Sequence, residues 1–290
     1  MSYFVSIPSD ITTNSILRYI EPFQIDKYCL SDYKLHQWCL NPDNIEYYLK
    51  LLSLDNFTID INKGLIWAIE QNSSMLVNYF LFKGANNYDE ALAESAYIGN
   101  SQIINQILTT ANEDLTVEGY NKAMMYAAQK CHTNIVKQML TLGARNYGDT
   151  LTHGAIHGCL EIVRLMIPFN NKFIFNYALR YAAERGYLDI VQLLVDNGAD
   201  EYNDSIVTAA QYGHIDIVKL MINLAILSGT LRRNIYNNVL YDAAMNEHPE
   251  IVKLMLELGA TNAFSVMFHA RKAAHLQMAD LIENFIEQSG

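Results

Sequence analysis

The sequence predicts an all-α fold, a solenoid of about eight stacked helix pairs preceded by a small helical unit of a different kind. The first observation is an apolar pair, such as Ile190-Val191, that returns at steps of 27, 32, 27, 28, 27, 34 and 27 residues. Regular steps of this length are typical of stacked helical repeats. The second is that 51% of the chain is hydrophobic, enough for a continuous core. The second residues of the pairs, used below as reference positions, are Val77, Ile104, Val136, Val163, Val191, Val218, Val252 and Ala279.

Two positions, eight and five residues before the reference position, indicate the first helix of each repeat. Each set of equivalent positions across the repeats is called a column below, and small residues dominate both columns. Alanine in the earlier column lets one helix lie close against the next, and glycine or asparagine in the later column suits a left-handed helix stop. The earlier column contains Ile69, Ala96, Ala128, Ala155, Ala183, Ala210, Ala244 and Arg271. The later column contains Asn72, Gly99, Cys131, Gly158, Gly186, Gly213, Glu247 and Ala274.

The second helix of each repeat is indicated by a stripe made of the apolar pair and the residue three positions beyond it, since this spacing falls on one helical face. The later members are Phe80, Ile107, Met139, Met166, Leu194, Met221, Met255 and Ile282. We expect the methionines to pack in the core and not to bind copper. The helix then closes at a Gly-Ala pair in four repeats, at Gly84, Gly143, Gly198 and Gly259.

Helices this short are marginal alone, so stability must come from stacking against neighbouring repeats. The first and last repeats depart from the columns, as expected of caps with one face in water. Ile69 replaces alanine at the start, while Arg271, Ala274 and Ala279 replace the alanine, glycine and valine at the end.

The composition excludes some classes of partner. Acidic residues outnumber basic ones, 31 to 20, for a net charge of −11, which disfavours nucleic acid and anionic membranes as main partners. The N-terminus has no basic and apolar segments of a signal peptide, and no apolar run is long enough to span a bilayer. The four cysteines, Cys29, Cys39, Cys131 and Cys159, form no C-x-x-C pair, which predicts a reduced, cytoplasmic protein without a disulfide framework or zinc site.

No motif indicates an enzyme or a cofactor. The chain has no glycine-rich phosphate loop, G-x-S-x-G elbow or paired-cysteine metal site. His153 and His157 are four residues apart, as in a helical metal pair, but no glutamate follows the first histidine and Gly154 is expected to interrupt the helix. We therefore expect both histidines to face solvent or a partner.

The repeat resembles the ankyrin repeat, whose consensus runs T-P-L-H-x-A-A-x-x-G-H-x-x-I-V-x-x-L-L-x-x-G-A. The segments "AAERGYLDIVQLLVDNGAD" and "AAQYGHIDIVKLM" match it, and the resemblance covers residues 63–290. It departs in two ways, because the T-P-L-H tetrad is absent and most repeats have 27 or 28 residues, below the usual ~33. We expect most β-hairpin fingers to be reduced to tight turns. The longer repeats ending at Ala128 and Ala244 would keep a finger or an extended helix.

Shortened repeats rich in asparagine and tyrosine look like the ankyrin families of giant DNA viruses, which would place the protein in the host cytoplasm. Residues 1–43 resemble the F-box: "IPSDI" matches its opening L-P-x-E-[IL], and "ILRYI" matches its I-L-x-Y-L core. Asp26 and Ser31 fit that pattern less well. The alternative is a helical N-terminal cap of the array. Residues 44–62 are expected to form a connecting helix.

The resemblances imply that the protein binds other proteins in a groove and uses no cofactor. The more specific hypothesis is that the protein is a substrate-recruiting adaptor of a cullin-type ubiquitin ligase. The F-box resemblance implies that the linker subunit of the ligase is contacted by Ile7, Pro8, Ile16, Leu17 and Ile20. A scaffold binding a host factor without a ligase is the alternative, and an enzyme with an unusual site is a remote one.

The expected groove residues flank the alanine column, and their mixture of aromatic and acidic side chains suits a protein ligand. They are Trp67, Glu70, Glu94, Tyr97, Tyr126, Gln129, His153, Tyr181, Glu184, Gln211 and Asp242. The alternative for Tyr126 and Tyr181 is that they fill the space left by missing fingers. Arg232 and Arg233 form a basic spot that is expected to be a solvated loop pair.

Overall fold

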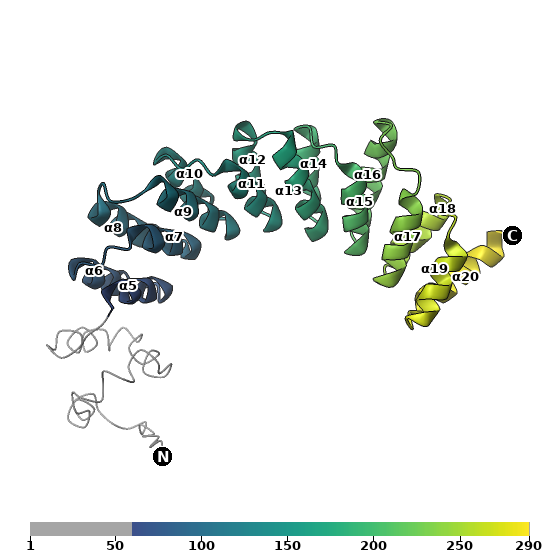
Figure 1. Cartoon of the computed structure of the whole chain (residues 1–290), viewed down its shortest axis with the longest axis horizontal. Coiled ribbons are helices and arrows are strands. Elements are labelled where there is room, and N and C mark those ends of the chain that lie inside the picture. Colours follow the sequence, from purple (N-terminus) through teal and green to yellow (C-terminus); the bar gives the residue numbers. More distant parts are fainter. Residues whose placement is uncertain (1–59, 290) are drawn as a thin grey trace, which may run out of the picture. The chain divides into compact units, whose positions relative to one another are not determined.

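The computed structural model describes residues 60–289, and every regular element within them is helical (Figure 1). The F-box-like residues and most of the expected connecting helix lie outside this range. The described residues fall into two compact units. Unit 1 comprises residues 60–95 and 100–114, and unit 2 comprises residues 96–99 and 115–289.

Unit 1 is built from two helix pairs. The first pair is α5 (Ile61–Glu70) and α6 (Ser74–Phe82), and the second is α7 (Tyr88–Ile98) and α8 (Ser101–Ala111). The last turn of α7 is grouped with unit 2. The second helices α6 and α8 contact each other.

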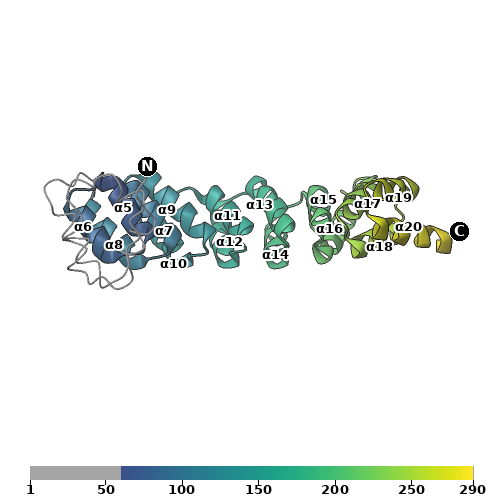
Figure 2. The ribbon, with the colours of Figure 1, turned by 90° about the horizontal axis from the view of Figure 1, so that it is seen from below.

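Unit 2 contains six helix pairs and a short 3-10 helix. In chain order these are α9 (Val117–Gln129), α10 (Thr133–Thr141), α11 (Tyr147–Ile156), α12 (Leu160–Met166), η2 (Ile167–Phe169), α13 (Lys172–Arg185), α14 (Leu188–Asp196), α15 (Tyr202–Gln211), α16 (Ile215–Leu227), α17 (Ile235–Met245), α18 (Pro249–Glu257), α19 (Ala263–Lys272) and α20 (Leu276–Ser289). First helices contact first helices from α9 to α19, and second helices contact second helices from α10 to α20. Figure 2 shows the two layers of this unit as two rows, α11 to α19 and α12 to α18. The all-helical, stacked-pair prediction is confirmed.

The prediction of shortened fingers is also confirmed for the described residues, which contain no strand. Only residues 197–201 separate α14 from α15. In the long repeat that ends at Ala244, the extra length enters α16, which has 13 residues where α14 and α18 have 9. The insertion therefore forms an extended helix, one of the two expected alternatives.

The core consists of the predicted columns. Ile69 and the six alanines of the alanine column are fully buried, and so are the apolar reference positions. The methionine column packs in this core, with Met139, Met166, Met221 and Met255 all at 0% exposure. Arg271, at the alanine position of the last repeat, is exposed and pairs with Glu283 at 2.5 Å. This exposed ion pair fits the expectation of a cap.

The helix-stop column adopts the left-handed conformation in all eight repeats, whatever residue occupies it. The glycines have φ between 76° and 89°, and the other occupants have φ between 56° and 66°. The non-glycine members are Asn72, Cys131, Glu247 and Ala274. Because a side chain in this conformation costs about 1–2 kcal/mol, the repeat geometry overrides the local preference of these residues.

In five repeats, an asparagine on the first helix bonds to the turn before the next first helix. Asn176 on α13 accepts hydrogen bonds through Oδ1 from the backbone N–H groups of Asp200 at 2.8 Å and Glu201 at 3.3 Å. Its counterpart Asn121 on α9 accepts from the turn 24 and 25 residues ahead in the same way. The remaining members of this asparagine bridge are Asn62, Asn203 and Asn237. These side chains satisfy backbone donors of tight turns that have no hairpin partner.

At the opposite end of the repeats, an aromatic residue before the second helix covers the glycine of the preceding repeat at four places in unit 2. A Cβ atom placed on Gly186 would lie 2.5 Å from the ring of His214, and one on Gly213 would lie 2.8 Å from that of His248. Nε2 of His214 also donates to the carbonyl oxygen of Glu184 at 2.9 Å. The same contact joins Gly99 to His132 and Gly158 to Tyr187. We call these contacts glycine–ring junctions.

Two predictions about local chemistry were wrong. Cys131 and Cys159 form a disulfide, with their Cα atoms 5.2 Å apart, so these two of the four cysteines are not free thiols. Stacking places residues about one repeat apart side by side, which separation along the chain does not reveal. Gly154 does not interrupt its helix, since α11 continues to Ile156. Gly154 is buried and leaves room for α12, because a Cβ there would lie 3.2 Å from Val163.

Candidate protein-binding surface

The predicted groove residues lie on the first helices of the pairs. In unit 1, Trp67 on α5 is almost fully buried, at 9% exposure, so its indole belongs mainly to the core. Glu70 is exposed and Glu94 on α7 is half-buried. Burial, with the nearby carboxylates of Glu70 and Glu90, raises the pKa of Glu94. This part of the surface is acidic, which favours cationic side chains of a partner.

In unit 2 the surface begins with two tyrosines. Tyr97, whose turn belongs to unit 2, meets Tyr126 edge to face with ring centroids 6.1 Å apart. The Lys130 ammonium lies 4.5 Å from the centroid of the Tyr97 ring. Gln129, the neighbouring predicted residue, is half-buried. The tyrosines therefore pack against each other while keeping part of their surface accessible.

His153 on α11 and His157, which directly follows this helix, stack with ring centroids 6.2 Å apart. Burial lowers the pKa of His153, and Nδ1 of His153 is buried without a hydrogen bond. The pKa of His157 is lowered by burial and by the charges of His153, Arg185 and Lys130. These shifts favour the neutral form of both rings. Among residues 60–289, no three His, Cys, Asp or Glu side chains are grouped to hold a metal ion.

An exposed aromatic face of unit 2 lies on α13. Phe173 and Tyr177 are 76% and 47% exposed, and Tyr181 follows one turn later. The hydroxyls of Tyr177 and Tyr181 are 3.1 Å apart, and their rings meet edge to face. The Arg180 guanidinium lies 5.3 Å from the Tyr181 ring centroid and 5.9 Å from that of Tyr177. A rigid cluster of this kind combines apolar area with hydrogen-bonding groups.

A small hollow of about 90 Å³ opens beside this cluster, between α13 and α15. Its lining residues are Asn176, Tyr177, Arg180, Glu201, Asp204 and Ser205. Asp204 also pairs with Arg232 at 2.7 Å, while the Arg232 side chain stays 64% exposed in its loop, as expected of a solvated loop residue. The hollow is large enough for one side chain and offers both signs of charge to it.

The predicted residues toward the C-terminus contribute less. Glu184 and Gln211 use their backbone carbonyl oxygens to accept hydrogen bonds from His214 and His248, both at 2.9 Å. Asp242 is half-buried, and burial raises its pKa.

Sequence reasoning missed several members of this surface. Tyr177 was not among the predicted groove residues. Tyr241 on α17 packs edge to face against His269 on α19 at 5.9 Å and was not selected. The spacing of Phe173, Tyr177 and Tyr181, four residues apart on one helix, was the available signal.

Comparison with known proteins agrees with this architecture. The profile described as ankyrin repeats (3 copies) matches residues 91–177 and 179–265. No curated protein matches the chain. Within residues 60–289, no helix combines the length and the apolar character needed to cross a bilayer. The two matched segments together span more than half of the sequence. Members of this family act through protein partners. The chain belongs to the ankyrin repeat family.

Proposed function

We propose that this chain is a protein-binding adaptor that holds a partner segment along the first helices of unit 2. The observation that supports this most directly is the aromatic face of α13, where Tyr177, Arg180 and Tyr181 form one cluster beside a hollow of about 90 Å³. Tyrosine and arginine are the residues most often found at interaction hot spots. The predicted residues Tyr126, His153 and Asp242 lie on other first helices of unit 2, namely α9, α11 and α17.

The shape of the surface suits an extended segment with at least one anchoring side chain. The tyrosine rings offer apolar area at little cost in conformational entropy, because Tyr177 and Tyr181 already restrain each other. The hollow presents carboxylates of Glu201 and Asp204 beside Arg180. An anchoring side chain that pairs with these groups would gain specificity as well as affinity.

The test is affinity purification with the intact chain and with the double variant Tyr177→Ala/Tyr181→Ala. A partner captured by the wild type should be confirmed with purified protein, and its Kd should rise at least ~30-fold in the double variant, as expected for two hot-spot tyrosines. Phe82→Ala is the matched control, because Phe82 is 88% exposed on a second helix of unit 1. If the double variant lowers the free energy of unfolding but leaves the Kd unchanged, the tyrosines only pack.

We further propose that residues 1–43 dock the chain on the linker subunit of a cullin-type ubiquitin ligase. The support is the ordered string "IPSDI" followed by "ILRYI" at F-box spacing. Ile7, Pro8, Ile16, Leu17 and Ile20 would make this contact.

Binding of the purified chain to a purified linker subunit tests this second proposal. Leu17→Asp should abolish binding, because a carboxylate would be buried without a partner. Tyr177→Ala/Tyr181→Ala should leave it unchanged, so the two proposals fail independently. An intact chain that does not bind the linker subunit supports a scaffold without a ligase.

A further inference from the structure

The disulfide stands where neighbouring repeats have a glycine–ring junction. Cys131 occupies the left-handed helix-stop column, with φ of 59°, and Cys159 directly precedes α12 as His214 precedes α16. Gly186 with His214, and Gly213 with His248, occupy the same two places further along unit 2. Among the junctions of residues 60–289, this one alone therefore has a covalent bond where others have a packing contact.

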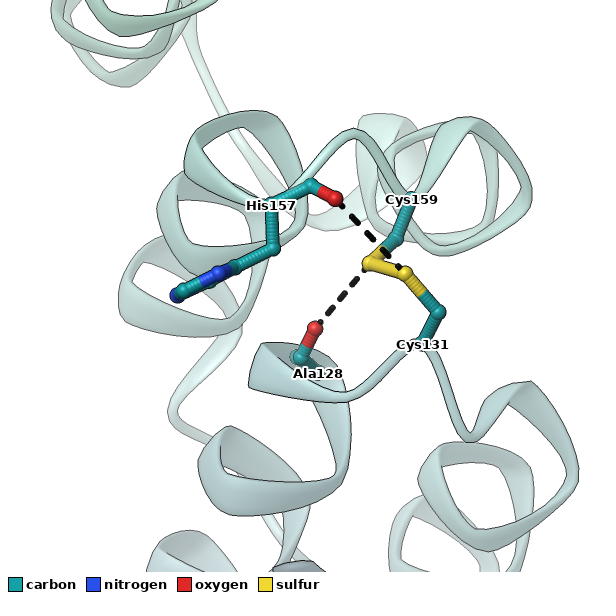
Figure 3. The surroundings of a disulfide bond; sticks show 4 residues. All are labelled: Ala128, Cys131, His157 and Cys159. Atoms are coloured by element: carbon teal, nitrogen blue, oxygen red, sulfur yellow. Dashed lines mark hydrogen bonds between the residues drawn. A yellow bond between two sulfur atoms is a disulfide. The ribbon is translucent and has the colours of Figure 1, made fainter.

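The surroundings of the two sulfur atoms fit both redox states. Sγ of Cys159 lies 3.2 Å from the carbonyl oxygen of Ala128, and Sγ of Cys131 lies 3.8 Å from that of His157 (Figure 3). In the disulfide neither sulfur has a hydrogen to donate. After reduction, each thiol has a carbonyl acceptor already beside it. The two sulfur atoms move apart on reduction, and these carbonyl oxygens are the acceptors closest at hand for the new S–H groups.

The two cysteines differ in accessibility. Cys159 is buried, at 5% exposure, whereas Cys131 is exposed at the end of α9. Lys130 follows α9 directly, and the charges of Lys130 and Arg185 both act on His157, next to the disulfide. Cys131 is therefore the sulfur that an incoming thiolate can reach, and the exposed Lys130 beside it in the chain carries a positive charge.

We propose that Cys131 and Cys159 form a redox modification site whose co-reactant is a small thiol–disulfide couple of the glutathione class. A thiolate attacks Sγ of Cys131, the S–S bond breaks, and Cys159 leaves as a thiolate that takes a proton from water. A second small thiol then displaces Cys131 from the mixed disulfide. The products are two protein thiols and one small disulfide, and oxidation is the reverse reaction.

The effect of this site is to change the stability of one junction. The disulfide links positions 28 residues apart and so removes conformational freedom from the unfolded form of the two repeats α9/α10 and α11/α12. In a stack where each repeat contacts only its neighbours, weakening one junction raises the frequency of local opening there. Oxidation would hold Tyr126 and His153, on these two repeats, in one arrangement, whereas reduction would let them separate transiently.

The experiment equilibrates the intact chain in mixtures of reduced and oxidised glutathione. Alkylation followed by peptide mapping measures the oxidised fraction, and hydrogen exchange measures the opening of α9 to α12. We expect a reversible titration without denaturant, at least ~10-fold slower exchange in α10 and α12 when oxidised, and a Tm higher by roughly 5–10 °C. The exchange of α17 and α18 should change much less.

The double variant Cys131→Gly/Cys159→His is the matched control, because it converts this junction into a glycine–ring junction. Its exchange should not depend on the glutathione ratio, and Cys131→Gly alone gives the same control if the double variant folds poorly. A disulfide that is reduced only after denaturation, thiols that stay unpaired in oxidised glutathione, or exchange that is equal in both states would each overturn the proposal.

Discussion

The junction between the α9/α10 and α11/α12 repeats and the junction between the α13/α14 and α15/α16 repeats are built alike at one end and differently at the other. At the turn before the next first helix, both use the asparagine bridge, with Asn121 in the former and Asn176 in the latter. At the helix-stop end, the former has a disulfide and the latter a glycine–ring junction. The comparison indicates that the helix-stop end accepts different chemistry while its backbone stays left-handed and the asparagine bridge is the same.

The largest effect is expected from Gly186→Ala, which challenges the glycine–ring junction directly. The substitution places a Cβ at φ of 79° and 2.5 Å from the His214 ring, so it adds backbone strain and displaces the ring. We expect the free energy of unfolding to fall by about 2–3 kcal/mol in denaturant titrations. Gly198→Ala is the matched control, because Gly198 has φ of 103° but nothing within 4 Å of a Cβ. Equal losses in the two variants would mean that the ring contact adds nothing.

A somewhat smaller loss is expected when the asparagine bridge is removed from either junction. Asn121→Ala and Asn176→Ala each leave two backbone N–H groups of a turn without their acceptor. Each variant should lose about 1–2 kcal/mol of unfolding free energy, and the two losses should agree if the bridge has the same role at both junctions. Asn238→Ala, on the exposed face of α17, should change stability by less than about 0.5 kcal/mol. A loss at only one junction would contradict the comparison.

The next effect has the opposite sign. Under reducing conditions Cys131→Gly should raise the free energy of unfolding by up to about 1 kcal/mol, because glycine adopts φ of 59° without strain. Under oxidising conditions the same substitution should lower it, because the disulfide is lost. Thermal unfolding of both proteins in both buffers measures the reversal. A variant that is less stable in both buffers would show that the left-handed cysteine is unstrained.

The smallest effect concerns His153, which lies on α11 in the disulfide-linked pair of repeats. Burial lowers its pKa in the folded state, while the unfolded chain binds a proton at the ordinary value of 6.5. Stability is therefore complete above pH 6.5 and falls as the pH drops from 6.5 toward the lowered value. His153→Gln should lose less stability than the wild type over this interval, as measured by urea titrations at several pH values. Parallel curves would show that His153 is not responsible.

The helix pairs and their core could be predicted from the sequence because they depend on local spacing. The alanine column and the helix stops follow from residues at fixed steps, and even Cys131 adopts the stop conformation that its column predicts. The asparagine bridge was missed although Asn121, Asn176, Asn203 and Asn237 recur in one column. Its partners are backbone groups of the next turn, and no pattern of side chains marks them.

The disulfide and the aromatic face of α13 depend on relations between repeats. Cys131 and Cys159 occupy different columns, and only the stacking of one repeat on the next shows that these columns touch. Similarly, the hollow beside Tyr177 is bordered by Glu201 and Asp204 from the following repeat. Predicting such features requires the offset between adjacent repeats as well as the period.

The helix-stop residue and the residue before the following second helix meet at several junctions. A disulfide can therefore be introduced at a different junction of the stack. Gly213 and His248 occupy the same two places as Cys131 and Cys159, so replacing both with cysteine should create a second crosslink there. A set of variants, each with a disulfide at one junction, would show how much each interface between repeats contributes to cooperative unfolding and to partner binding.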